Sequence, residues 1–377
     1  MSVADRVLGK WFADHGRGMR NIVRAYVDLN AIRHNLALVR QICPRSRIMA
    51  VVKADAYGHG LLPVARALSD ADGLAVARLH EALVLRDSGS TQRILLLGTL
   101  LDEGALEICS ERHIDVTAHD EESLDLIVAR ARVSPLCVWL KLDCGMHRMG
   151  FNEEAFIRAD RILSAHDGVR ELIHMGHLSN ARDGGRRAAE LARFWACHRL
   201  ASKASVSLAN SAALIASRET HADWVRPGIL LYGDNPLQGA QSLSVRAAMT
   251  VRAPVIALRE IGTGESVGYD GCWTSGRPSR IATVGIGYAD GYPRHAKNGT
   301  PVGVNADTGA LVGRVSMDSL AVDVTDCGRV SVGDQAMLWG PELPAARIAT
   351  SADTISYELF TSLNQRVRRV YEPEQPI

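Results

Sequence analysis

The sequence has no excess charge of either sign. Its 43 Lys and Arg residues stand against 42 Asp and Glu residues, which leaves a formal net charge of +1 over 377 residues. Such a chain has no general field to attract nucleic acid or an anionic membrane, so any anion site must be built from a few local groups. A membrane-spanning helix needs about 18 consecutive apolar residues. The best run, 94–101, is short and is interrupted by Gly98 and Thr99, so we expect no membrane span.

Cysteine pairs are also missing. The seven cysteines are odd in number and scattered, and they form no C-x-x-C pair. This usage predicts reduced thiols and a cytoplasmic location. The first 22 residues lack the basic start, apolar centre and small-residue cleavage site of a signal peptide. The length suggests two domains, and the 47% hydrophobic content is enough to give each of them a core.

The first part of the chain alternates short apolar, β-branched runs with longer segments of helical period. Eight such runs with seven clear helical segments between them predict an N-terminal (β/α)8 barrel of the TIM type over residues 23–245. A doubly wound open sheet would rarely need eight consecutive units. The predicted strands are 48–52, 74–77, 94–97, 114–117, 137–142, 172–175, 206–209 and 224–230, and the clearest helices are 61–68, 121–131, 153–165 and 186–200.

The remainder, residues 246–377, alternates apolar and polar residues with frequent glycine. This texture predicts a mostly antiparallel β domain with one late helix at 354–360. The early strand 24–29 precedes the barrel units and could pair with either domain. The predicted strands of the β domain are 250–258, 280–286, 302–304, 320–324 and 336–339.

Polar residues gather where the predicted barrel strands end, which is where barrel active sites lie. Lys53 follows the first strand. A lysine partly desolvated beside other cations loses proton affinity and can form a Schiff base with an aldehyde, of which pyridoxal 5'-phosphate is the obvious example. The phosphate would need donors such as the hydroxyls of Tyr57 and Ser211 and the backbone N–H groups of Gly228 and Ile229.

Six ordered motifs resemble those of the alanine racemases, which are pyridoxal-phosphate enzymes with an N-terminal barrel and a C-terminal β domain. The resemblance extends from Tyr26 to Tyr371. It implies an isomerase that interconverts L- and D-alanine and supplies D-alanine for peptidoglycan. The motifs are AVVKADAYGHG around Lys53, KLDCGMHRMG around Arg148, ANSAA at 209–213, WVRPGILLYG around Arg226, GYADGYPR around Tyr288 and GRVSMD ending at Asp318.

The resemblance also implies residue roles. Lys53 would hold the cofactor and act as one proton-transfer base, and Tyr288 would act as the other on the opposite face of a planar carbanion. Arg226 would meet the pyridine nitrogen without readily accepting a proton, which suppresses transamination. The implied cofactor-binding residues are Lys53, Tyr57, Arg148, His177, Asn210, Ser211, Arg226, Gly228, Ile229 and Tyr371; the implied substrate-binding residues are Arg148, Met317 and Asp318.

In the family, the residues here numbered Tyr288 and Met317 reach the active site of the other subunit. The resemblance therefore implies a homodimer with shared sites. Lys141 matches a position where some members carry a carbamylated lysine. Two positions depart from the family pattern: Ser207 stands where some racemases have a histidine behind the catalytic tyrosine, and Ser316 stands where cysteine is frequent.

Several alternatives stay open at this point. Lys141 could be a buried lysine paired with Asp143, and Arg148 and Arg226 could be ion-pair partners of Asp143 and Asp223. The enzyme could instead act on serine or on several amino acids, or be a decarboxylase of the same architecture. It could also be a protein that binds the cofactor without catalysis, like the pyridoxal-phosphate homeostasis proteins, which have a single barrel and no β domain.

The sequence also argues against a metal site and against a dinucleotide site. His174 and His177 fall on a strand without a nearby ligand set, so we expect no metal. The glycine-rich run 285–291 lacks the spacing and the following helix of a dinucleotide site.

Overall fold

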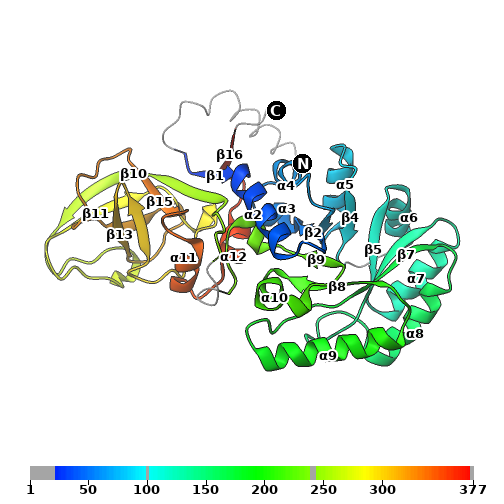
Figure 1. The fold of residues 1–377 in the computed structure, drawn as a ribbon. Coiled ribbons are helices and arrows are strands. Elements are labelled where there is room, and N and C mark those ends of the chain that lie inside the picture. Colours follow the sequence, from blue (N-terminus) through cyan, green and yellow to red (C-terminus); the bar gives the residue numbers. More distant parts are fainter. Residues whose placement is uncertain (1–21, 99–101, 238–242, 374–377) are drawn as a thin grey trace. The chain divides into compact units, whose positions relative to one another are not determined.

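The structure is a computed structural model that describes residues 22–98, 102–237 and 243–373. The chain divides into two compact units (Figure 1). The first, called here the barrel unit, comprises the described residues between 28 and 248, and the second, the β unit, comprises residues 249–373 together with residues 22–27. None of the described helices is long and apolar enough to cross a membrane.

The barrel unit contains eight parallel strands that close in sequence order, from β2 to β9, with β2 paired to β9. The predicted TIM-type barrel is therefore confirmed. The helices run along its outside (Figure 1). The strands are β2 (Arg47–Val51), β3 (Gly73–Val76), β4 (Arg93–Leu96), β5 (Ile114–Ala118), β6 (Leu136–Lys141), β7 (Val169–Met175), β8 (Ser205–Asn210) and β9 (Trp224–Arg226).

The barrel strands are buried on both faces, as parallel strands under covering helices should be. Several of the helices begin at an Asp or Asn whose side chain accepts a backbone N–H bond, as Asn152 does from Ala155. The helices are α2 (Leu29–Ile42), α4 (Leu61–Ala67), α5 (Leu79–Asp87), α6 (Glu103–Glu111), α7 (Glu121–Ala131), α8 (Glu153–Ser164), α9 (Gly184–Leu200) and α10 (Ser211–Ala216), with short 3₁₀ turns η1 (Arg218–Thr220) and η2 (Ile229–Tyr232).

The last barrel strand is shorter than the sequence predicts. The expected strand 224–230 ends at Arg226, and residues 229–232 form the 3₁₀ turn η2 instead. Pro227 has no N–H to donate to a neighbouring strand, so the strand pairing stops there. The chain consequently turns at Gly228, directly beside the predicted phosphate-binding residues.

The β unit is antiparallel. Its strands lie in the order β11-β14-β13-β12-β15-β10-β1-β16, and β10 also pairs with β11, so six of them close on themselves. The early strand β1 pairs with β10, through Ala25 opposite Val251. The strands are β1 (Arg24–Asp28), β10 (Met249–Ile261), β11 (Ser279–Val284), β12 (Pro301–Val304), β13 (Asp307–Val312), β14 (Leu320–Asp323), β15 (Gln335–Trp339) and β16 (Arg368–Glu372).

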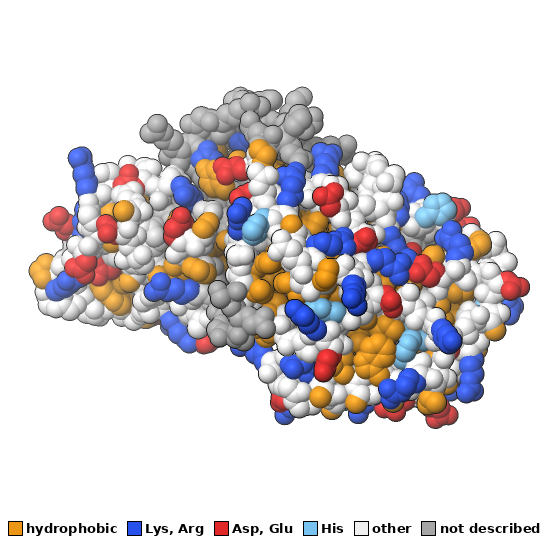
Figure 2. Space-filling model, in the orientation of Figure 1, with side chains coloured by type: hydrophobic (Ala, Val, Ile, Leu, Met, Phe, Trp, Pro, Cys, Tyr) orange, Lys and Arg blue, Asp and Glu red, His pale blue; other side chains and the backbone are white. Residues whose placement is uncertain are grey.

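Three elements of the β unit were not predicted. Strand β13, with the sequence DTGALV, is exposed at its first two residues and carries too few apolar residues to signal a strand. Strand β16 and helix α11 (Ala345–Ser351) were also missed, whereas α12 (Ser356–Ser362) lies near the predicted late helix. Lys, Arg, Asp and Glu side chains are interspersed on the face shown in Figure 2, in keeping with the balanced composition.

Candidate active site

Lys53 begins an unusual turn, labelled α3 (Lys53–Tyr57), where β2 ends. Residues 54–57 all have φ between 53° and 55°, which is the left-handed region. For residues other than glycine this conformation costs about 1–2 kcal/mol each. Backbone bonds hold the turn, together with the Asp55 carboxylate, which accepts the Leu61 N–H at 2.7 Å. Backbone strain is thus concentrated directly after the predicted cofactor lysine, as is common at functional sites.

The surroundings of Lys53 favour a neutral amine. Burial lowers the pKa of Lys53, the positive charge of Arg148 lowers it further, and the carboxylate of Glu81 partly opposes both. A lower pKa raises the fraction of the unprotonated amine, which is the form that attacks an aldehyde carbon and accepts a proton. The barrel unit therefore places a nucleophilic lysine at the C-terminal end of its first strand.

Three of the predicted phosphate-binding residues, Tyr57, Ser211 and Gly228, lie together in the barrel unit. The Ser211 hydroxyl accepts the backbone N–H bonds of Gly228 at 2.8 Å and of Leu230 at 3.3 Å. A Cβ atom added to Gly228 would lie 2.4 Å from the Tyr57 hydroxyl, so that hydroxyl faces the same spot. The Tyr57 ring is held by stacking on Tyr232, with 4.7 Å between ring centroids. The hydroxyls of Tyr57 and Ser211 therefore meet beside the N–H groups of Gly228 and Leu230, which are bonded to Ser211 Oγ, and these are the donor types that a phosphate group binds.

Arg226 is buried without a carboxylate partner among the residues that the structure describes. Its guanidinium donates to the Ser207 hydroxyl at 2.5 Å and to the Gly176 carbonyl at 2.6 Å. Burial lowers the pKa of Arg226 to about 10. Asp223, the alternative ion-pair partner, instead accepts the Val206 N–H at 2.7 Å. The departure at Ser207 thus supplies a neutral ligand to the guanidinium.

His177, two residues after β7, lies beside Asn210, the last residue of β8. Burial and then the charge of Arg226 lower the pKa of His177 to about 3, so the imidazole is neutral at physiological pH. The Asn210 side-chain amide donates to the Leu178 carbonyl at 2.8 Å, and its carbonyl oxygen accepts the Ala213 N–H at 3.0 Å. Asn210 therefore holds the loop that carries His177 and caps α10.

Lys141 is buried at the end of β6. Burial, followed by the charges of Arg226 and Arg148, lowers the pKa of Lys141 to about 8. The Asp143 carboxylate, its alternative partner, is instead hydrogen-bonded to two backbone N–H groups and lies 3.0 Å from His147 Nδ1. In the described part of the chain, no salt bridge joins Lys141 to an acid. A neutral amine is thus available at this position.

The β unit brings Tyr288 and Met317 together. The Tyr288 N–H donates to the Ser316 carbonyl at 3.0 Å, and the Ala289 N–H donates to the Met317 carbonyl at 2.9 Å. The Tyr288 side chain is 39% exposed and that of Met317 is 54% exposed. Asp318, next in sequence, is ion-paired with Arg366 at 2.6 Å. Tyr371 lies in β16 and is half-buried.

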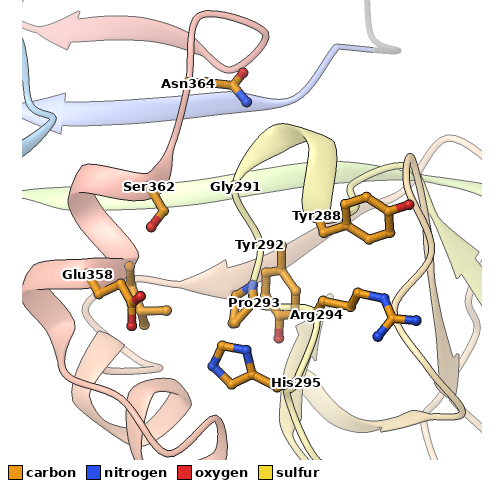
Figure 3. Close-up of a pocket in the computed structure, with 10 residues that line it drawn as sticks. Tyr288, Gly291, Tyr292, Pro293, Arg294, His295, Glu358, Ser362 and Asn364 are labelled. Atoms are coloured by element: carbon orange, nitrogen blue, oxygen red, sulfur yellow. The ribbon is translucent and has the colours of Figure 1, made fainter.

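A cavity of about 350 Å³ lies beside Tyr288 within the β unit. Figure 3 shows Arg294 next to the Tyr288 ring, and Glu358 on the opposite side of the cavity. Tyr292 also lines it, and its buried hydroxyl has no hydrogen-bond partner among the described residues. The surroundings of Tyr288 therefore combine a cation, a carboxylate and a buried hydroxyl.

Sequence reasoning passed over one exposed tyrosine. Tyr269 lies in the 3₁₀ turn η3 (Tyr269–Gly271), between β10 and β11, and its side chain is 67% exposed. The turn has positive φ values at Gly268, Asp270 and Gly271, and the Asp270 carboxylate lies 3.4 Å from the Arg314 guanidinium. An aromatic residue close to several glycines, in a long connection between strands, was the signal that could have found it.

The sequence matches two family models. The alanine racemase N-terminal domain matches residues 27–236, and the alanine racemase C-terminal domain matches residues 248–371. The alanine racemase of Chromohalobacter salexigens is 45% identical over 354 residues, which cover 92% of this chain and 97% of that protein. The biosynthetic alanine racemase of Pseudomonas aeruginosa is 44% identical over 358 residues, 94% of this chain and 99% of that protein.

Solved structures agree in fold. The crystal structure of biosynthetic alanine racemase from Pseudomonas aeruginosa superposes with a TM-score of 0.90 at 43% identity, covering 93% of this chain and 99% of that one. Alanine racemase from Bartonella henselae, solved with covalently bound pyridoxal phosphate, superposes with a TM-score of 0.86 at 31% identity. The match covers 93% of this chain and 99% of that one.

Proposed function

This chain belongs to the alanine racemase family, and on that premise we propose that it interconverts L-alanine and D-alanine with pyridoxal 5'-phosphate as cofactor. The observation that carries the proposal is the cradle of Tyr57, Ser211 and Gly228 beside a lysine of lowered pKa. The physiological role would be to supply D-alanine for peptidoglycan.

The barrel domain, residues 23–245, would hold the cofactor. Lys53 would bind it covalently through Nζ, and Tyr57, Ser211, Gly228, Ile229 and, from the β domain, Tyr371 would bind its phosphate. When bound, the cofactor withdraws electrons from the attached amino acid and so acidifies its α-hydrogen.

Arg226 would face the pyridine nitrogen. Its guanidinium donates hydrogen bonds and does not readily accept a proton, so it would leave that nitrogen unprotonated and favour racemisation over transamination. Arg148 and the neutral His177 would complete the cofactor's surroundings, and Asn210 would hold the His177 loop in place.

Racemisation needs a proton-transfer group on each face of the α-carbon. The neutral amine of Lys53 would take or return the proton on one face. A tyrosine of the β domain, residues 246–377, would act on the other, and such assistance is worth roughly a hundred- to ten-thousand-fold per group. The sequence predicts Tyr288, and the structure offers Tyr269 as a second candidate.

We rank Tyr269 ahead of Tyr288 on exposure and support. A phenol that serves the site of another subunit must project from its own, and Tyr269 is 67% exposed whereas Tyr288 is 39% exposed. The turn that carries Tyr269 has positive φ values at Gly268, Asp270 and Gly271, and Asp270 forms a surface ion pair with Arg314. In this view Tyr288 would line the approach to the site, beside the cavity with Arg294.

The protein would then act as a homodimer with shared sites. Each β domain would supply the tyrosine, the Met317 backbone N–H and Asp318 to the other subunit, where they would meet the substrate together with Arg148. Met317, at 54% exposed, is accessible at the surface of its own subunit, as a residue that serves the site of another subunit must be.

The defining experiment incubates purified full-length protein and cofactor with L-alanine in deuterated water. We expect optical rotation to fall to zero while deuterium appears at the α-carbon, with D-alanine identified by chiral chromatography. A parallel incubation with L-serine tests the broader-specificity racemase. Cofactor binding with unchanged rotation of every amino acid tried would instead favour a binding protein without catalysis.

The same assay distinguishes the two tyrosines. Tyr269→Phe removes one hydroxyl and should lower kcat by about a hundred- to ten-thousand-fold while the cofactor stays bound. Tyr288→Phe should lower kcat/KM by less than about tenfold, mainly through a higher KM, and serves as the matched control. The opposite pattern would assign the second base to Tyr288, and full activity in both variants would refute a tyrosine base.

A further inference from the structure

A buried carboxylate lies directly behind the lysine turn. Glu81, in the first turn of α5, is buried, and its Oε1 accepts the backbone N–H of Ala54 at 2.6 Å. Its Oε2 accepts the N–H groups of Ala77 and Arg78, both at 3.0 Å. No salt bridge to Glu81 is found among the described residues. Its charge is therefore balanced by three backbone donors from the segments that follow β2 and β3.

The hydrogen bond from Ala54 to Glu81 lies where the backbone enters its left-handed turn. Ala54 follows Lys53 and is the first of the four residues that adopt left-handed φ values. Residues with a Cβ atom persist in that conformation only where the surrounding structure holds them. A hydrogen bond to an ionised carboxylate is stronger than one between neutral groups, so Glu81 is suited to hold this turn.

We propose that Glu81 is a positioning residue for Lys53: its carboxylate holds the left-handed turn in place and supplies a negative charge close to the lysine amine. The proposal deepens the proposed function, because it rests on Lys53 being the acting amine. It differs from a purely structural role in making the basicity of Lys53 depend on the charge at position 81.

The charges around Lys53 set the direction of the effect. Arg148, Lys141 and Arg226 are cations near the barrel mouth, and His177 there is neutral. Of the acids, Glu81 raises the pKa of Lys53. Asp55, in the same turn, has its carboxylate bonded to the Leu61 N–H. The charge of Asp143 raises the pKa of Lys141 instead.

Neutralising Glu81 should accordingly lower the pKa of Lys53 still further. The fraction of charged amine at neutral pH would fall. The acidic limb of the pH profile of kcat, which reports the enzyme–substrate complex, would move to lower pH.

The test uses cofactor-free, full-length protein, in which the Lys53 amine is unmodified. Competitive acetylation at a series of pH values, with Lys53 followed by mass spectrometry, reports its pKa without any need for turnover. Glu81→Gln should lower that pKa by about 0.5–1 unit. Glu81→Asp keeps the charge on a shorter side chain, so the pKa should stay near the wild-type value while kcat falls severalfold.

Glu190→Gln is the matched control. Glu190 is also a buried glutamate, and it accepts N–H bonds from Ser179 and Asn180 in the segment after β7. We expect a loss of thermal stability similar to that of Glu81→Gln and no change in the Lys53 pKa.

Two outcomes would overturn the proposal. The first is an unchanged Lys53 pKa in Glu81→Gln, which would make Glu81 structural only. The second is an equal shift of that pKa in Glu190→Gln, because the shift would then follow general loosening of the barrel. If Glu81→Gln does not fold, the pKa and kcat of Glu81→Asp decide the question. A shifted pKa in a protein that does not racemise alanine would refute the function and leave the role of Glu81 standing.

Discussion

Two buried cations of the barrel unit differ from the exposed, paired cations of the β unit. In the barrel unit, Lys141 and Arg226 are buried, and in the described part of the chain neither has a carboxylate partner. In the β unit, Arg277, Lys297 and Arg366 are exposed, and each is paired with an aspartate. Exposed pairs of that kind contribute only about 0–1 kcal/mol. Burying a cation without an acid partner destabilises the folded protein, so we expect a bound anionic ligand to stabilise these two cations.

The contrast is tested most strongly at Arg226. Arg226→Glu replaces the buried cation with an acid that can protonate the pyridine nitrogen. We expect racemisation to fall by about a hundred- to ten-thousand-fold and the production of keto acid from alanine to rise, both measured on the same samples. Asp326→Asn, which breaks the exposed pair with Arg277, is the control and should change neither rate. An unchanged ratio of transamination to racemisation would count against the assigned role of Arg226.

A smaller effect is expected at Gly228. In Gly228→Ala the new Cβ would lie 2.4 Å from the Tyr57 hydroxyl, so the cradle must open. Overpacking of this size costs about 1–3 kcal/mol, which corresponds to cofactor binding weakened by about five- to a hundred-and-fifty-fold. Absorbance titration with cofactor measures it. Gly276→Ala, where nothing lies within 4 Å, is the control. Equal affinities in both variants would place the phosphate elsewhere.

The smallest effect is expected at Lys141. Because its pKa is lowered to about 8, the neutral amine needed to react with CO₂ is present near neutral pH and grows as pH rises through that value. The product, a carbamate formed with loss of one proton, would neutralise the cation cluster. Adding bicarbonate should raise activity severalfold, more at pH 8 than at pH 6, and ¹³C NMR with labelled bicarbonate should show a carbamate signal. Lys141→Met should abolish both responses, while Lys297→Met, at an exposed pair, should retain them.

The barrel could be predicted because its signal is local and repeated. Each barrel strand is an apolar run and each helix has its own period, so eight units were countable without any long-range information. The end of β9 at Arg226 was missed because the apolar run continues through Ile229 and Leu230, and only the backbone shows that it becomes a 3₁₀ turn. Strand β13 was missed for the opposite reason, since its apolar content is low.

Among the proposed site residues, Lys53, Tyr57, Ser211 and Gly228 were predicted from where they follow the strands. Tyr269 and Glu81 were not. The local sequence does not show whether a tyrosine is exposed, or whether a carboxylate is bonded to backbone N–H groups of distant residues. Both properties depend on how separate segments pack.

The amino-acid order alone determined that an eight-unit (β/α) barrel precedes a β domain, and which lysine stands at the end of the first barrel strand. These properties depend on residue type and spacing along a few turns of chain. Folding in three dimensions decided the protonation of that lysine, the neutral ligands of Arg226 and the partners of Glu81. Desolvation and hydrogen bonding act between atoms that are close in space, and segments far apart in sequence provide them.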